Sequence, residues 1–251
     1  MTALQLDALP SDIKTRFAPF GSEVLARCPD CLVSLAVTGS AVTPDFDAST
    51  SDINSIMILK DASFDFIRFL APLGKNYRQH KIAVPLVMTR DYIESSLDVF
   101  PIEFLDLKLI HTTVYGADLL GALAVDPRNL RLQCEREIKT RLLALSQGYI
   151  AHLGEAGATA SLLVRLVKNS FPLMRAILTI LGKQPPVPRD AVIAQIEQSM
   201  PLERGVFSRI ISLRHAGTAP DTEAVNTVSE QLYRTLEILS RHVDALPNAS
   251  A

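Results

Sequence analysis

The sequence has little of several residue types, and each shortage excludes a class of protein. Tryptophan is absent and aromatic residues make up only 6% of the 251 residues, so we expect a mainly aliphatic core. No uninterrupted apolar run reaches the ~18 residues that a membrane span requires. The most apolar stretch, residues 171–181, is shorter and contains Arg175. We therefore expect a protein that does not enter a membrane.

The sequence also lacks an excess of charge of either sign. It has 25 basic and 27 acidic residues and a formal net charge of -2. Proteins that bind nucleic acid usually have a basic excess or a clustered basic face, so the composition argues against a nucleic-acid partner. The remaining composition, 48% hydrophobic and 21% charged, is that of an ordinary globular protein.

Cysteine is scarce and odd in number. The three cysteines, together with a start that has no apolar leader, favour a cytoplasmic protein with reduced thiols. Cys28 and Cys31 match the pattern C-x-x-C, which is typical of a redox pair or of half a metal site. No second pair and no histidine cluster completes a metal site in the sequence.

The first half of the chain mixes two hydrophobic periodicities. Apolar residues at three- and four-residue spacing predict helices over residues 11–28 (bent at Pro19), 64–73 and 91–97. Short β-branched runs between turn residues predict strands over residues 32–37, 53–59, 82–89, 101–109 and 112–115. Proline at position 85 fits only an edge strand or a bulge.

In the second half of the chain, the apolar residues follow only the helical spacing. Predicted helices cover residues 129–153, 159–181 (broken around Pro172), 189–199, 202–215 and 221–246, with a proline-rich linker at residues 185–188. The change of character near Asp126 predicts two domains. An α/β domain would span residues 1–124, and a helical domain would span residues 125–251.

The polar residues between the first two predicted strands indicate a phosphate site. One strand ends at Gly39-Ser40, and the next begins through Asp52 and Asn54. Glycine lets the backbone approach a ligand closely, and turn amides with a hydroxyl can hold an anion. Mg²⁺ prefers one or two carboxylates together with phosphate oxygens, which Asp52 could supply. The alternative interpretation is that Asp52 only closes the loop.

These residues resemble the motif of the nucleotidyltransferases of the DNA polymerase beta superfamily. That motif has a Gly-Ser turn, then Asp-x-Asp on the adjoining strand, and a third carboxylate on a later strand. Gly39 and Ser40 match the turn and Asp52 matches the first acid. Glu103 is the best match to the third acid, with Asp106 in reserve.

The resemblance implies an α+β fold, in which a small mixed-sheet nucleotidyltransferase-like domain precedes an all-α helical bundle. It implies attack by an acceptor hydroxyl, on a small molecule or a protein, at the α-phosphorus of a nucleoside triphosphate. Asp52 and Glu103 would be catalytic and would bind Mg²⁺ or Mn²⁺. Gly39, Ser40 and Asn54 would bind the nucleotide.

The sequence departs from the motif at Asn54, which stands where the family has its second acid. Asparagine is neutral, so the two-metal chemistry of the family is in question. This leaves an alternative function, in which a catalytically degenerate member binds a nucleotide or another protein. The sequence leaves a homodimer open.

Basic residues in the helical half have two interpretations. Arg165, Lys168 and Arg175 lie on nearby helical turns, and we expect a solvated or ion-paired basic face in preference to nucleotide contacts. Arg209 and His215 have the spacing of the ribonuclease motif of HEPN domains, although an apolar residue follows Arg209. An RNA-directed toxin or antitoxin component is therefore a third, weaker hypothesis.

Overall fold

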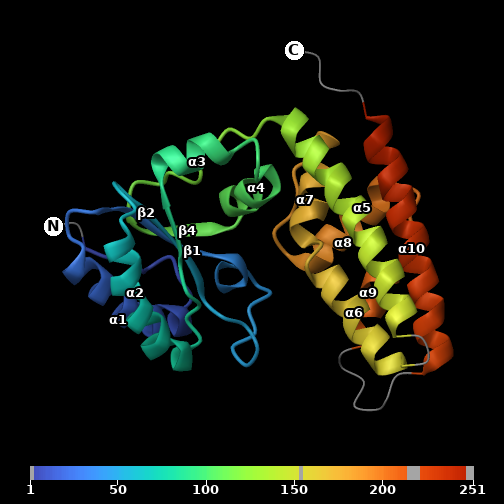
Figure 1. Cartoon of the computed structure of the whole chain (residues 1–251), viewed down its shortest axis with the longest axis horizontal. Helices are drawn as coiled ribbons and strands as arrows, with labels where there is room; N and C mark the ends of the chain where they lie inside the picture. Colours follow the sequence, from blue (N-terminus) through green and yellow to red (C-terminus); the bar gives the residue numbers. More distant parts are fainter. Residues whose placement is uncertain (1–2, 153–154, 214–220, 247–251) are drawn as a thin grey trace. The chain divides into compact units, whose positions relative to one another are not determined.

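The computed structural model describes residues 3–152, 155–213 and 221–246, and the chain forms two compact units (Figure 1). The first unit comprises Met1–Asp98 and Phe104–Ala124. The second comprises Val99–Glu103 and Val125–Ala251. These units differ from the domains expected from the sequence at residues 99–103, which group with the C-terminal helices.

The first unit is built on a mixed sheet of four strands. The strands are β1 (Leu32–Thr38), β2 (Asn54–Leu59), β3 (Leu86–Thr89) and β4 (His111–Gly116). Their order in the sheet is β3-β2-β1-β4. The central strand β1 pairs antiparallel with β2 and β4, and β2 pairs parallel with β3. The start of β2 and the end of β1 therefore lie side by side, at the same end of the strands; we call this end the edge of the sheet.

Helices cover both faces of this sheet. They are α1 (Ser11–Arg27), α2 (Phe64–Tyr77), α3 (Arg90–Ser96) and α4 (Pro101–Leu109), with short 3-10 turns η1 (Gly39–Val42) and η2 (Arg78–His80). One hydrophobic core joins α1 and α2 to alternate residues of the strands, such as Leu35, Val37 and Met57. Ala36 and Ile56, which point to the opposite face, are also buried.

The second unit is helical. It contains α5 (Pro127–Ala151), α6 (Ala156–Lys168), α7 (Phe171–Ile180), α8 (Arg189–Ser199), α9 (Val206–Ser212) and α10 (Thr222–Ala245). The long helices α5 and α10 run antiparallel (Figure 1). Tyr149 near the end of α5 donates to Asn226 near the start of α10 at 2.9 Å, and Arg131 near the start of α5 donates to the carbonyl of Asp244 at 3.0 Å. The α+β fold class is therefore confirmed.

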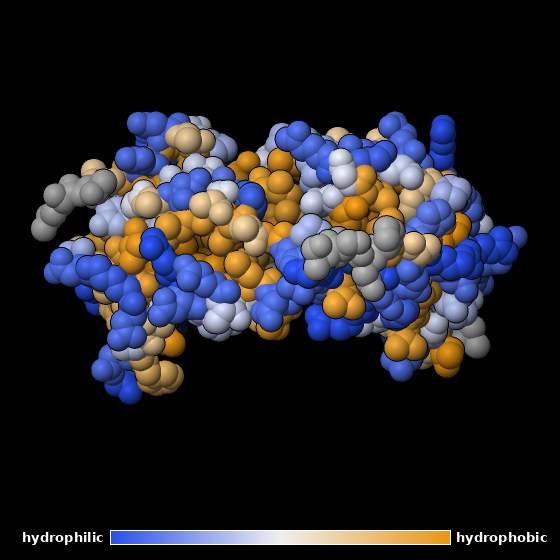
Figure 2. Space-filling model, turned by 90° about the horizontal axis from the view of Figure 1, so that it is seen from above, coloured by the Kyte–Doolittle hydropathy of each residue, from blue (hydrophilic) through white to orange (hydrophobic). Residues whose placement is uncertain are grey.

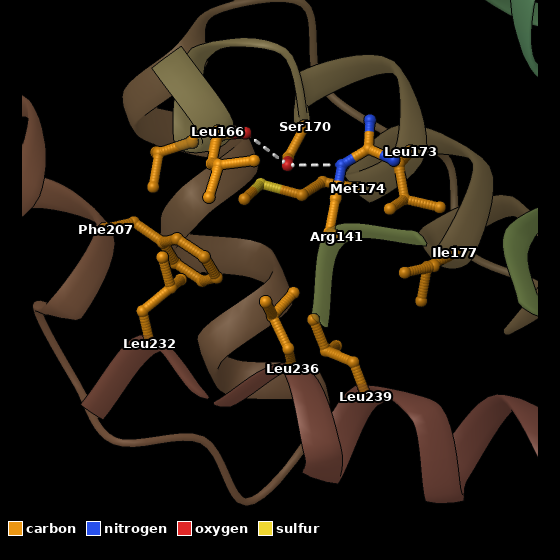
Figure 3. Close-up of a pocket in the computed structure, with 11 residues that line it drawn as sticks. Arg141, Leu166, Ser170, Leu173, Met174, Ile177, Phe207, Leu232, Leu236 and Leu239 are labelled. Carbon is orange, nitrogen blue, oxygen red and sulfur yellow. Dashed lines mark hydrogen bonds between the residues drawn. The ribbon is translucent and has the colours of Figure 1, made fainter. Parts of the chain in front are cut away.

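The core of the helical unit is closely packed (Figure 3). It encloses a cavity of only about 10 Å³, lined mainly by apolar side chains. At its edge, the Arg141 guanidinium donates to the Ser170 hydroxyl at 2.9 Å, and this hydroxyl donates to the Leu166 carbonyl at 2.7 Å. A cavity of this size holds one water molecule at most, so it is a packing defect and no ligand site.

Residues 101–109 form helix α4, so the strand predicted there is wrong. Pro101, Ile102, Phe104 and Leu105 are buried and Glu103 is exposed, and this three- and four-residue spacing is that of one face of a helix. Pro101 begins the helix, where its missing N–H costs nothing. The side-chain oxygen of Gln133 accepts a hydrogen bond from the Ile102 amide at 2.7 Å and so supports the first turn.

Prolines interrupt the helices less than the sequence suggested. Helix α1 continues through Pro19 without a break, and α2 continues through Pro72 to Tyr77, so the predicted end of α2 is wrong. In α1, the fully buried Phe17 and Phe20 flank the proline, and tertiary packing can hold a helix despite one lost hydrogen bond. The break near Pro172 is confirmed, because the proline lies in the first turn of α7.

The surface mixes polar and apolar side chains, as Figure 2 shows for one face. Several large apolar side chains are exposed, including Val84 (74%), Ile150 (73%) and Phe64 (69%). Within the described residues, no helix combines the length and the apolar character needed to cross a bilayer.

Candidate functional site

The turn after β1 contains a glycine whose backbone a ligand could approach closely. Gly39 has a φ of +70°, a left-handed conformation that is strained for residues with a side chain. Its amide donates to the Ile110 carbonyl at 3.4 Å, which joins the turn to the start of β4. The carbonyl of Ser40 accepts from the Thr43 amide at 3.0 Å and closes η1. Glycine at this position is therefore a requirement of the turn.

Asn54 lies against this turn. It pairs with Thr38, the last residue of β1, in the antiparallel register of the two strands. A Cβ atom placed on Gly39 would lie 3.5 Å from the amide nitrogen of Asn54. The structure therefore brings together the turn and Asn54, two parts of the nucleotide site that the sequence predicts.

Asp52 is exposed at the entrance to β2. Both of its neighbours are held by backbone hydrogen bonds: the Ser51 amide donates to the Asp47 carbonyl, and the Ile53 amide donates to the Lys81 carbonyl, each at 2.7 Å. Ile53 is fully buried, whereas Asp52 and Asn54 are exposed. In an extended segment, side chains two residues apart point to one side, so Asp52 and Asn54 share a face.

The loop before Asp52 has its own network of hydrogen bonds. The Asp47 carboxylate accepts from the hydroxyl and the amide of Ser49, at 2.6 and 2.8 Å, and from the Thr50 hydroxyl at 2.8 Å. These bonds favour the ionised carboxylate and lower the pKa of Asp47 to about 2. The Lys81 ammonium donates to the carbonyls of Ala48 and Ser49. Sequence reasoning missed Lys81, because it lies far from the motif and has no pattern of its own.

Glu103 lies on α4, and the expectation that it lies on a strand is wrong. One of its carboxylate oxygens accepts from the Gln133 amide at 2.8 Å, within the second unit. Asp106 is on the same helix. The role of Glu103 as a catalytic metal ligand stays a prediction.

The four strands contain no aspartate or glutamate at all. Among the described residues, no three histidine, cysteine or acidic side chains gather closely enough to hold a metal ion. Asp52 and Asn54 offer one carboxylate and one amide oxygen. This donor set fits a single Mg²⁺ or Mn²⁺ that also binds phosphate oxygens, but it does not fit a two-metal cluster.

His111 is the first residue of β4 and pairs with Thr38. It therefore lies on the other side of β1 from Asn54. Its side chain is only 9% exposed, although a histidine near the end of a sheet usually faces solvent. The ring nitrogen Nε2 lies 2.9 Å from the Asp118 carboxylate, which also accepts from the Gly121 amide. The Gly121 amide and His111 together lower the pKa of Asp118. His111 is thus held in place at the start of β4, beside the end of β1.

The basic residues of the helical unit do not form one solvated face. Arg175 is only 4% exposed, and it donates to the carbonyls of Pro186 at 3.2 Å and Val187 at 2.8 Å. Its role is to hold the proline-rich linker, so the surface interpretation is wrong for Arg175. Arg209 contacts the Glu203 carboxylate at 3.2 Å, and His215 lies outside the described residues.

The cysteines do not build a catalytic redox site. Cys28 and Cys31 are paired in a disulfide with Cα atoms 5.3 Å apart, so the expectation of reduced thiols is wrong for this pair. They follow the C-terminus of α1, whereas redox cysteines are activated at a helix N-terminus. Cys134 is free and buried, and burial raises the pKa of its thiol.

A groove of about 580 Å³ lies between α5 and α10 in the helical unit. Tyr149, Ile150 and Tyr233 are among the residues that line it. None of the residues predicted from the nucleotidyltransferase motif lines this groove, so it is a separate feature of the molecule.

The comparisons with known proteins identify the fold. No protein-family model matches the sequence, and no curated protein matches it. Among solved structures, the chain is similar to spectinomycin adenyltransferase AAD(9) from Enterococcus faecialis, determined with ATP and spectinomycin. The TM-score is 0.51 and the identity is 13%, over 89% of this chain and 98% of the other. The chain therefore has a nucleotidyltransferase-like α+β fold across nearly its whole length.

Proposed function

We propose that the chain binds a nucleoside triphosphate at the edge formed by Gly39, Ser40, Asp52 and Asn54, and transfers its nucleoside monophosphate to a hydroxyl of a small molecule. The hydroxyl oxygen would attack the α-phosphorus and pyrophosphate would leave. The residues of this edge would bind and orient the triphosphate. A single Mg²⁺ or Mn²⁺ held by Asp52 would supply charge neutralisation at the phosphates.

One observation carries the proposal: a left-handed glycine turn meets the Asn54 side chain, and Asp52 is exposed two residues earlier, at the entrance to β2. An anion bound at the turn would lie near a carboxylate that can share its metal ion. The similar fold of an adenyltransferase solved with ATP and a small-molecule acceptor supports this choice of substrates. Spectinomycin is accordingly the first acceptor to test.

A second candidate function has its own support. The strands carry no acid, and position 54 holds a neutral amide. This donor set favours a protein that binds the nucleotide without transferring it, as a degenerate member of the fold would.

Calorimetric titration with each of the four common ribonucleoside triphosphates, with and without Mg²⁺ or Mn²⁺, tests the binding site. We expect metal-dependent binding in the wild type and its loss in Asp52→Ala. Asp61→Ala is the matched control, because Asp61 is an exposed carboxylate just beyond the other end of β2. Equal loss in both variants, or no binding by the wild type, would contradict the proposal.

Pyrophosphate release distinguishes transfer from binding alone. A wild type that releases pyrophosphate in the presence of an acceptor supports transfer. A wild type that binds the nucleotide but releases none supports the second candidate, and in that case Asn54→Asp should gain release, because it supplies the missing carboxylate. Glu103→Gln tests the remaining predicted metal ligand in the same assay.

A further inference from the structure

We propose that Lys81 is a positioning residue for Asp52, and that it holds the β1–β2 loop in the conformation that binds the metal-bound triphosphate. This inference rests on the proposed function of the same site. It assigns a role to a residue that lies 29 positions after Asp52 and is absent from the motif.

The backbones of Lys81 and Ala83 form hydrogen bonds with both the amide and the carbonyl of Ile53. The Lys81 carbonyl accepts from the Ile53 amide at 2.7 Å, and the Ile53 carbonyl accepts from the Ala83 amide at 3.0 Å. Ile53 and Ile82 form an isolated parallel bridge, and both side chains are buried. The residue directly after Asp52 is therefore fixed on both sides of its backbone.

The side chain of Lys81 holds the other end of the same segment. Its ammonium donates to the carbonyl of Ala48 at 3.2 Å and also to that of Ser49. The Asp47 carboxylate organises the same loop through Ser49 and Thr50, and Lys81 adds to the lowering of the pKa of Asp47. One residue thus ties the loop from both sides of Asp52.

The conformation of Lys81 is itself unusual. With φ 55° and ψ 35°, it is the one residue other than glycine with a positive φ among the described part of the chain. The turn that ends a 3-10 or α-helix in this way usually has glycine, which adopts the left-handed region without strain. A strained residue that persists where glycine would fit indicates that its side chain is needed.

The consequence for binding follows from preorganisation. Asp52 is exposed, and an exposed carboxylate on a free loop would lose conformational entropy when it binds a metal ion. Fixing both flanking segments reduces this cost before the ligand arrives. Residues that orient a metal ligand typically change metal affinity 10- to 100-fold when they are removed.

The test uses the full chain with Lys81→Met, Lys81→Gly, Lys81→Arg and the control Lys75→Met, which removes another exposed lysine. Hydrogen–deuterium exchange of residues 47–53 without ligand measures the loop. Titration with ATP, in the presence and absence of MgCl₂, measures the site. Thermal unfolding measures stability.

We expect faster exchange in Lys81→Met and about a 10-fold weaker Mg²⁺-dependent affinity for ATP, with the metal-free affinity unchanged. Lys81→Gly should show the same losses without a lower melting temperature, since it relieves the left-handed strain. Lys81→Arg should restore a large part of the affinity, because it keeps a donor of the same charge. A purely structural lysine would lower stability and binding together.

Three results would overturn the proposal. If Lys81→Met exchanges at the wild-type rate while the wild type binds nucleotide normally, Lys81 does not hold the loop, and the proposed function stands. Faster exchange with unchanged Mg²⁺-dependent affinity shows that the loop does not position Asp52. If the wild type binds no nucleotide, both the proposed function and this role of Lys81 are contradicted.

Discussion

The two units of the molecule place their charged side chains in opposite ways. The helical unit buries Arg175 and most of Arg141, and gives their guanidinium groups carbonyl and carboxylate partners from neighbouring segments. The sheet of the first unit has no charged side chain in its strands apart from a titratable histidine. At one edge of this sheet, Asp47, Asp52 and Lys81 lie near the surface.

This difference distinguishes charged side chains that stabilise the fold from charged side chains that are free to bind a ligand. A buried charge must be fully hydrogen-bonded, so it has no capacity left for another partner. At the sheet edge, Asp52 is exposed while its neighbours are fixed, which is the arrangement of a preorganised ligand. The predictions below test whether mutations in the two regions affect different properties, stability in one and binding in the other.

The largest effect on stability is expected for Arg175→Met. The change removes the donors to the carbonyls of Pro186 and Val187 from a buried position, which costs about 3 kcal/mol of unfolding free energy. Urea denaturation measures it, with Arg165→Met as the control because Arg165 is exposed. Equal stability of the two variants would show that Arg175 does not hold the linker.

A smaller effect is expected for Gln133→Leu. Gln133 accepts from the Ile102 amide and donates to Glu103, and it is buried, so its loss should cost about 1–3 kcal/mol. Denaturation of Glu103→Gln is the comparison. This second variant keeps the size of the side chain and should change stability less. A larger loss in Glu103→Gln would make Glu103 the structural partner of the pair.

The smallest effect is expected from the titration of Asp47. Its folded pKa of about 2 lies below the ordinary value of 3.8, so the loop is stabilised fully above pH 3.8 and loses this contribution as the pH falls toward 2. Hydrogen–deuterium exchange of residues 47–51 between pH 2 and pH 5, corrected for the intrinsic rates, should show this transition. Asp47→Asn should abolish it, and a transition that persists in the variant would assign it to another group.

The sequence predicted the elements whose local signals agree with their environment. The glycine turn, β1, β2, α8 and the change to an all-helical second half follow from turn chemistry and periodicity. Residues 101–109 were misassigned, because a short apolar run interrupted by single polar residues fits both periods, and only the tertiary fold decides for the helix.

The site could be predicted only in part. Gly39 and Asp52 are close in sequence to the strands that carry them, so the motif located them. Lys81 follows η2 in a left-handed conformation and donates to a loop more than 30 residues earlier, and such a long-range hydrogen bond leaves no local pattern. The contact of His111 with Asp118 joins residues on either side of a turn at Gly116, which has a φ of +75°. These contacts depend on the tertiary fold, which periodicity does not encode.

The most direct test of the account is the hydrogen-exchange footprint of Mg²⁺-ATP on the whole chain. The account predicts protection at residues 39–42 and 52–54, where the turn and Asp52 would bind the triphosphate, and no such protection in Asp52→Ala. Protection confined to the groove between α5 and α10, or no protection at any concentration that saturates known ATP sites, would contradict it.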